Sequence, residues 1–230
     1  MKKFFLVSCL FFSLVFYANA EGMAERNAIG TEKSDISYSF GMILAMDFID
    51  SGLEFNYSSL IKGFRDAHQG ADTRFSMSDA MEIAQNAYLN SMEKISEKNI
   101  QEENIFLADN ASKEGVLVCE SGLQFEILEE GSGEYPLISD TVKVHYEGSL
   151  INGFVFDSSY NRGEPEEFPL QGVIPGFSEG IMLTRLGGKT RMYIPSNLAY
   201  GPRGIGGIPP YSTLIFEIEL LEIRDAEEHE

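Results

Sequence analysis

The feature that most constrains this chain is a change in the spacing of its apolar residues close to Gly115. From about residue 34 to residue 110, apolar residues recur at three- and four-residue steps, which is the period of an amphipathic helix. After Gly115 they alternate with polar residues, as in strands with one buried face. The sequence therefore predicts an α+β protein: an all-α N-terminal part, then an antiparallel β-sheet with one short helix.

Three helices are expected in the first part. The first two cover about residues 34–52 and 56–70, and Asn56 can cap the second. A capping sequence at Ser76 opens a third helix. If this helix continues to Lys113, it is roughly 55 Å long at 1.5 Å per residue.

A helix of that length extends beyond any core that the N-terminal residues can build. We therefore expect its second half to be a solvated connector. Its first half carries more apolar residues than one short hairpin covers, which indicates a homodimer through the N-terminal helices. The alternative is a three-helix bundle packed on itself. The methionines of the helical part are expected to serve either as core filler or as a surface for client proteins. They are Met42, Met46, Met77, Met81 and Met92.

The N-terminus has the pattern of a secretory signal peptide. Two lysines precede an apolar segment over residues 4–17, and Ala18-Asn19-Ala20 follows as a cleavage site. Residues preceding Cys9 resemble a lipoprotein cleavage box, but the apolar segment continues past that cysteine. We expect cleavage near Ala20 and export to the periplasm, free or associated with the outer membrane. The alternative is a cytosolic protein whose N-terminus only resembles a signal.

The chain is strongly acidic. Without Lys2 and Lys3 it has 15 basic and 36 acidic side chains and a net charge of −21, so nucleic acid is excluded as a partner. The acidic tail over residues 225–230 is expected to be solvated. Only Cys119 remains after cleavage, and its apolar neighbours favour a small buried residue of a strand over an intermolecular disulfide.

The C-terminal part ends in a loop rich in glycine and proline, residues 199–210, followed by a strand over residues 214–220. Leu214, Phe216, Ile218 and Leu220 alternate with polar residues on that strand. We expect the loop to close over one end of the strand, so that Tyr200, Ile208 and Phe216 reach a common apolar space. The glycines lack the spacing of a phosphate-binding loop.

Several kinds of chemistry are missing. The three histidines are far apart in sequence, with no metal-ligand spacing, so neither a metal nor a cofactor is expected. No serine or cysteine has the context of a catalytic nucleophile. What remains are apolar residues where strands meet loops, where pockets open, together with Asp157 and Arg162. These apolar residues are Tyr146, Phe156, Val173, Ile174, Phe177, Tyr200, Ile208 and Phe216.

On these residues the sequence resembles the FKBP-type peptidyl-prolyl cis-trans isomerases, over roughly residues 121–224. The N-terminal part, with its Ser37-Tyr38-Ser39-Phe40-Gly41 segment, is similar to the macrophage infectivity potentiator and FkpA-like exported bacterial members. The matching C-terminal segments are Val142-Lys143-Val144-His145-Tyr146-Glu147-Gly148, Phe156-Asp157-Ser158-Ser159, Val173-Ile174-Pro175-Gly176-Phe177, Ala199-Tyr200-Gly201 and Ile208-Pro209-Pro210 through Phe216.

The resemblance implies a site. Asp157, Tyr200, Tyr146 and Phe216 would be catalytic, with Asp157 facing the turning carbonyl carbon and held by Tyr146 and Arg162. Phe177 would form the floor beneath the proline ring, and Phe156 a wall. Val173 and Ile174 would contact the peptide through their backbone, Tyr200 would donate to a substrate carbonyl, and Ile208 would close the rim.

The resemblance also implies a domain order: signal peptide 1–20, helical dimerisation domain 21–75, long helix 76–114, isomerase domain 115–224 and tail 225–230. The clients would be unfolded or proline-containing exported polypeptides. Two departures stand out. Phe177 replaces the family's common Trp, and the segment from Glu164 to Gly172 is short and acidic, whereas many members carry an aromatic near the position of Glu166. We therefore expect weaker binding of macrolide inhibitors. The alternative function is a catalytically weak holdase or ligand-binding module that uses the same pocket.

Overall fold

The computed structural model describes residues 32–49 and 51–225. Contacts divide this part of the chain within the first helix, into residues 32–46 and the residues from Asp47 onward. The predicted signal peptide, the first residues of the predicted dimerisation domain and residues 226–230 of the predicted tail lie outside the described residues. No helix in the described ranges has both the length and the apolar character that a membrane span requires.

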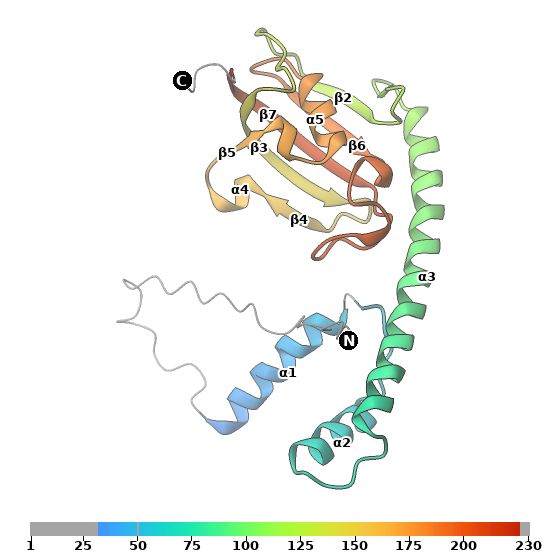
Figure 1. Cartoon of the computed structure of the whole chain (residues 1–230). Helices are drawn as coiled ribbons and strands as arrows, with labels where there is room; N and C mark the ends of the chain where they lie inside the picture. The colour runs from blue at the N-terminus through green and yellow to red at the C-terminus, as the bar shows by residue number, and fades with distance from the viewer. Residues whose placement is uncertain (1–31, 50, 226–230) are drawn as a thin grey trace, which may run out of the picture. The chain divides into compact units, whose positions relative to one another are not determined.

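The helical part contains the three expected helices (Figure 1). They are α1 (Lys33–Ile49), α2 (Tyr57–His68) and α3 (Met77–Ala111). The Asn56 Oδ1 atom accepts a hydrogen bond from the Ser59 amide at 3.0 Å, and the Ser76 Oγ atom accepts one from the Asp79 amide at 3.1 Å. Each bond satisfies a donor that the first turn of a helix leaves free. Helix α3 has 35 residues and is therefore roughly 52 Å long.

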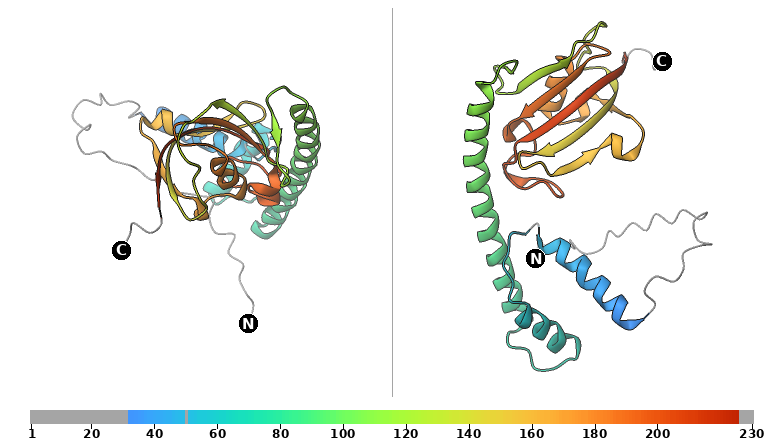
Figure 2. Two further views of the ribbon diagram at one scale, coloured as in Figure 1. Left: turned by 90° about the horizontal axis from the view of Figure 1, so that it is seen from above. Right: turned by 180° about the vertical axis from the view of Figure 1, so that it is seen from behind.

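Beyond α3 the chain forms one antiparallel sheet with strand order β1-β2-β6-β7-β3-β4, and β5 also pairs with β3. Seen from above in Figure 2, the sheet curls around the short helix α5. The strands and helices are β1 (Leu117–Val118), β2 (Gln124–Glu129), β3 (Thr141–Leu150), β4 (Val155–Ser158), α4 (Ser159–Arg162), β5 (Glu166–Pro169), α5 (Pro175–Met182), β6 (Lys189–Ile194) and β7 (Leu214–Arg224).

The core lies between the sheet and α5. Strands β3 and β7 pair along their length, with Tyr146 opposite Ile218 and Gly148 opposite Phe216. The inward residues of both strands are buried, and Phe177 and Ile181 of α5 pack against them. The predicted alternation therefore faces the core as expected, and the predicted α+β fold class is confirmed. The inward residues of the two strands are Val142, Val144, Tyr146, Leu150, Leu214, Phe216, Ile218 and Leu220.

The second half of α3 differs from the expected solvated connector, because one of its faces packs against the sheet. Asn110 is 0% exposed and its Nδ2 atom donates to Gln124 Oε1 at 2.9 Å. The Gln124 side chain donates in turn to the carbonyl of Leu107 at 2.8 Å, and the Phe106 ring lies 5.9 Å from that of Tyr193. Phe106 and Asn110 are four residues apart, which places them on one helix face.

Cys119 also differs from its prediction. It lies one residue after the short strand β1 and is partly exposed, because the chain turns there and the Cys119 amide donates to the Leu123 carbonyl at 2.8 Å. Partial burial, with the nearby Glu179 carboxylate, raises the pKa of the thiol to about 11. The thiol is therefore protonated and unreactive at neutral pH.

Candidate active site

A cavity of about 490 Å³ opens at one end of the sheet, above the first turns of α5. Strands β3, β4, β5 and β7 contribute its walls, and the loop between β6 and β7 contributes its rim. Nine of the ten predicted site residues line this cavity. They are Tyr146, Phe156, Asp157, Val173, Ile174, Phe177, Tyr200, Ile208 and Phe216.

The floor and walls of the cavity are a packed set of aromatic rings. Phe177 is 4% exposed, and its ring centroid lies 4.8 Å from that of Phe216 and 6.0 Å from that of Tyr146. Phe156 meets Phe216 edge to face at 5.5 Å. Such tilted and edge-to-face pairs are the favoured arrangements of aromatic rings, so the rings together form a continuous apolar surface.

Gly148 makes this arrangement of rings sterically allowed. A Cβ atom at this position would lie 2.7 Å from ring atoms of both Phe156 and Phe216. That distance is well inside van der Waals contact, so no larger residue fits while both rings keep their places. Glycine is therefore required at position 148 because two aromatic rings approach the β3 backbone closely there.

The polar edge of the cavity is a network around Asp157. The Tyr146 hydroxyl donates to Asp157 Oδ2 at 2.5 Å, and the Arg162 guanidinium pairs with both Asp157 and Glu166. The Nη2 atom of Arg162 also donates to the Tyr146 hydroxyl at 2.8 Å. Asp157 is on β4 and Arg162 in the short helix α4, so the tight turn between them brings the ion pair together. Arg162, the tenth predicted residue, does not line the cavity but contacts Asp157 and Tyr146, which do.

These contacts fix the charge of the network. Burial acts to raise the pKa of Asp157, but hydrogen bonds from Tyr146 and Arg162 and the guanidinium charge outweigh it, and the pKa falls below its usual value. Burial, together with the acceptor Asp157, raises the pKa of the Tyr146 hydroxyl. At neutral pH the cavity therefore presents an ionised carboxylate held by a neutral phenol and a cation.

The sequence did not reveal two further residues of the site. Phe168 lines the cavity and packs against Tyr146 at 5.5 Å and Phe177 at 5.8 Å. Glu166 Oε2 accepts from the Tyr146 hydroxyl at 3.3 Å and pairs with Arg162. Both lie on β5, within a segment that the sequence presents only as short and acidic. The available signal was the two-residue period of a strand, which places Glu166 and Phe168 on one face and Glu167 on the other.

Among the described residues that line the cavity there is no serine, threonine, cysteine or histidine. Within residues 32–49 and 51–225, no group of three or more histidine, cysteine or carboxylate side chains is placed to hold a metal ion. An apolar cavity with one fixed carboxylate at its edge suits the binding of an uncharged, ring-shaped side chain and its neighbouring amide.

Both parts of the chain match families of known proteins. Residues 133–221 match the family model for FKBP-type peptidyl-prolyl cis-trans isomerase, and residues 33–127 match that for the domain amino terminal to it. The FKBP-type 22 kDa peptidyl-prolyl cis-trans isomerase of Escherichia coli K12 is 43% identical over 199 residues, which cover 84% of this chain and 96% of that protein. The outer membrane protein MIP of Legionella longbeachae is 37% identical over 217 residues, or 91% of this chain and 93% of that protein.

A solved structure supports the same assignment. The crystal structure of FkpA from Escherichia coli aligns with a TM-score of 0.63 at 35% identity, over 86% of this chain and 100% of that one. The chain therefore belongs to the FKBP-type peptidyl-prolyl cis-trans isomerases. It is an enzyme that accelerates rotation about the X–Pro bonds of polypeptides.

Proposed function

We propose that X–Pro rotation takes place in the aromatic cavity, with the substrate proline ring on Phe177 and the twisting carbonyl facing Asp157. Rotation of a peptide bond crosses a barrier of roughly 18–20 kcal/mol because twisting breaks amide resonance. No covalent bond forms or breaks, so neither a nucleophile nor a metal is required. A dry cavity that favours the twisted amide over the planar one lowers this barrier by differential binding.

In this proposal the aromatic walls bind the substrate proline, and the polar edge stabilises the twisted amide. Phe156 and Phe216 enclose the proline, and the backbone of Val173 and Ile174 contacts the peptide. Tyr200 donates to a substrate carbonyl while Ile208 closes the rim. Tyr146 and Arg162 keep Asp157 ionised and oriented. The single observation that supports this assignment best is the Tyr146–Asp157–Arg162 network at the edge of an otherwise apolar cavity.

Exchange of a short Xaa-Pro peptide tests the proposal. We expect Asp157→Ala to lower kcat/KM by about 10- to 100-fold, because it removes a preorganised charge, and Tyr200→Phe to lower it by about threefold. Glu164→Ala and Tyr135→Phe are matched controls, because both residues are exposed and neither lines the cavity. Full activity in folded Asp157→Ala would reject the catalytic assignment.

We further propose that the chain is a homodimer joined by its N-terminal helices, with the helical domain over residues 21–75, the long helix over residues 76–114 and the isomerase domain over residues 115–224. Support comes from large apolar side chains that remain exposed on these helices, among them Phe64 at 67% and Met81 at 64%. Sedimentation of the mature protein tests this. A monomer at micromolar concentration, or a dimer that survives Met81→Glu together with Phe64→Glu, would contradict it.

The same helices supply the proposed chaperone activity. Two cavities on one dimer would hold an unfolded exported client at two points, so that avidity exceeds the affinity of either cavity. Export to the periplasm is proposed on the signal-like N-terminus, and a relative named outer membrane protein MIP is consistent with it. Fractionation of cells that produce the full chain tests the location, and retention in the cytoplasm would oppose it.

The alternative function is a holdase that binds clients without useful turnover. The observation that favours a holdase is the set of exposed apolar side chains on α2 and α3, which provide a surface for clients. Client protection against aggregation, measured beside peptide exchange, separates the two functions. Protection that is unchanged in Asp157→Ala while exchange is lost would show that holding is independent of the isomerase cavity. Weak macrolide binding, expected from Phe177, remains a prediction.

A further inference from the structure

The loop that closes the cavity, residues 199–213, is here called the rim loop. It carries Tyr200 and Ile208, which line the cavity from the open side. The loop is braced internally, because Ile205 and Ile208 exchange backbone hydrogen bonds of 3.0 and 2.9 Å. The Tyr211 amide also donates to the Gly201 carbonyl at 2.8 Å. The loop therefore behaves as one piece whose position depends on what holds its two ends.

Both ends are held by one side chain of the long helix. Glu103 of α3 accepts a hydrogen bond from the Ser196 amide at 2.6 Å and one from the Ser196 hydroxyl at 3.0 Å, just before the rim loop begins. The same carboxylate accepts from the Thr213 hydroxyl at 2.9 Å, where the loop ends. Ser196 and Thr213 are buried, so little water is present to replace these bonds.

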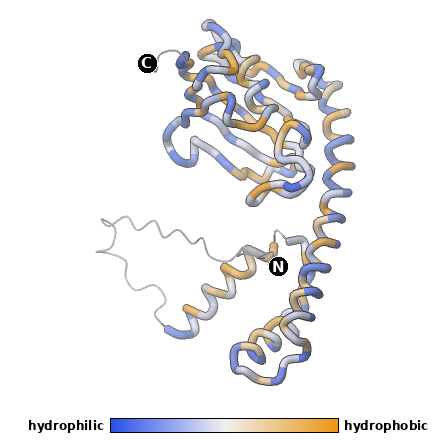
Figure 3. Tube along the Cα trace, viewed as in Figure 1, coloured by the Kyte–Doolittle hydropathy of each residue, from blue (hydrophilic) through white to orange (hydrophobic). Residues whose placement is uncertain are grey.

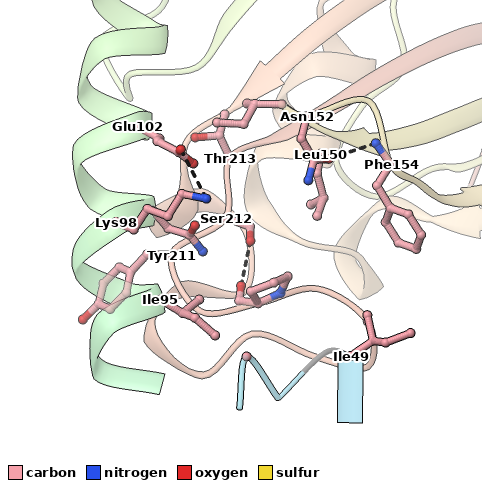
Figure 4. A pocket seen from close by; sticks show the side chains of 15 residues that line it. Ile49, Ile95, Lys98, Glu102, Leu150, Asn152, Phe154, Tyr211, Ser212 and Thr213 are labelled. Carbon is pink, nitrogen blue, oxygen red and sulfur yellow. Dashed lines mark hydrogen bonds and ion pairs between the residues drawn. The ribbon is translucent and has the colours of Figure 1, made fainter. Parts of the chain in front are cut away.

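A second contact holds the loop one helical turn earlier. The Asn99 side chain donates to the carbonyl of Pro210 at 2.7 Å. Asn99 and Glu103 are four residues apart and therefore share one face of α3. Figure 4 shows this junction, with Ser212 and Thr213 beside the turn of α3 that carries Lys98 and Glu102. None of these contacts belongs to the pairing of β6 with β7, and all of them connect α3 to the rim loop or to Ser196 just before it.

We propose that Glu103, assisted by Asn99, is a positioning residue for the isomerase reaction. It fixes the two ends of the rim loop and so sets where Tyr200 and Ile208 meet the substrate. The inference rests on the proposed roles of these two residues. Helix α3 is then more than a connector, because a bend or twist of α3 near Asn99 would displace the rim of the cavity. Preorganised contacts of this kind reduce the cost of ordering a loop when substrate binds.

The test uses the full-length protein and the Glu103→Ala variant, which removes the acceptor of all three hydrogen bonds. We expect kcat/KM for Xaa-Pro peptide exchange to fall about tenfold, since small displacements of positioning groups have effects of this order. Glu102→Ala is the matched control, because it removes the same side chain one residue away, where Glu102 pairs with Lys98, and it should be without effect. Thr213→Val removes one hydrogen bond of the set and should cost about threefold, and it serves as the test if Glu103→Ala folds poorly.

A double-mutant cycle distinguishes positioning from general stability. Tyr200→Phe alone is expected to cost about threefold, so if Glu103 acts through Tyr200, the tenfold effect of Glu103→Ala should shrink to about threefold in the Tyr200→Phe background. The tenfold effect should persist in the Asp157→Asn background. Equal effects in both backgrounds would overturn the inference. Faster amide exchange at Ile208 and Tyr211, with unchanged exchange in β3 and β7, should accompany the loss of activity. Looser amides with full activity would also overturn it.

Failure of the proposed site is a separate outcome. If Tyr200→Phe alone retains full activity, the proposed role of Tyr200 is wrong. Glu103 is then judged by the same cycle with Ile208→Ala, the other rim residue. An unchanged kcat/KM in Glu103→Ala rejects the inference in every case.

Discussion

The helical part and the sheet part of this chain differ in how far they bury their apolar residues. Hydrophobic residues recur along α1, α2 and α3 (Figure 3), yet α2 buries none of its residues and α3, in the described chain, buries only Ser91 and Asn110. The sheet part encloses its apolar residues around α5, with Ile218 at 0% exposure. The sheet part therefore buries its own hydrophobic surface, whereas the helices leave theirs exposed, and this difference is the basis of the proposed homodimer.

The largest expected effect is on stability. Ile218→Ala should lower the free energy of unfolding by about 2–5 kcal/mol, because it leaves a cavity in a closed core. Met81→Ala should change the stability of dilute protein by no more than about 0.5 kcal/mol. Urea denaturation at two protein concentrations measures both. A large and concentration-dependent loss in Met81→Ala would show that the exposed surface is buried by a second copy.

The second prediction concerns where the sheet part begins. A fragment starting at residue 115 loses the contacts of Asn110, Phe106 and Glu103 with the sheet part, whereas one starting at residue 98 keeps them. We expect the shorter fragment to be less stable by about 3 kcal/mol, at about 1 kcal/mol for each buried contact. Its peptide turnover should also be reduced. Equal melting temperatures for the two fragments would show that α3 contributes nothing to the sheet part.

The smallest predicted effect is a shift in a pH profile, and it separates the polar edge of the cavity from its apolar walls. Asp157 has a lowered pKa, so wild-type turnover should be level from pH 8 down to about 4. Any stability that the ionised carboxylate contributes is present above its unfolded pKa and is lost as pH falls through the folded value. Arg162→Leu removes a cation and leaves Glu166 close by, so the acid limb should move upward by about one pH unit.

Phe168→Leu is the control for this shift, because it alters a wall of the cavity and leaves the ion pairs of Arg162 in place. It should lower turnover at every pH without moving the acid limb. Superimposable profiles for Arg162→Leu and wild type would mean that Asp157 does not need Arg162 to remain ionised.

Local patterns in the sequence predicted most of the fold. Helix caps at Asn56 and Ser76 and the alternation along β3 and β7 depend on neighbouring residues, and the structure places them as expected. The cavity residues were predicted through the family resemblance, because strand ends far apart in sequence meet there. The docking of α3 was missed, since Asn110 and Gln124 are ordinary polar residues until the tertiary fold pairs them. Phe168 was not predicted because the glutamates next to it interrupt the apolar–polar alternation by which a strand is recognised.

Gly148 has a consequence for how this sequence can change. It does not line the cavity, yet the volume that any other side chain would need there is already filled by the rings of Phe156 and Phe216. A substitution at this position would have to displace one of these two rings, both of which line the cavity. Tolerance to substitution in this enzyme therefore does not simply increase with distance from the cavity. A position that never touches a client can be as restricted as one that does.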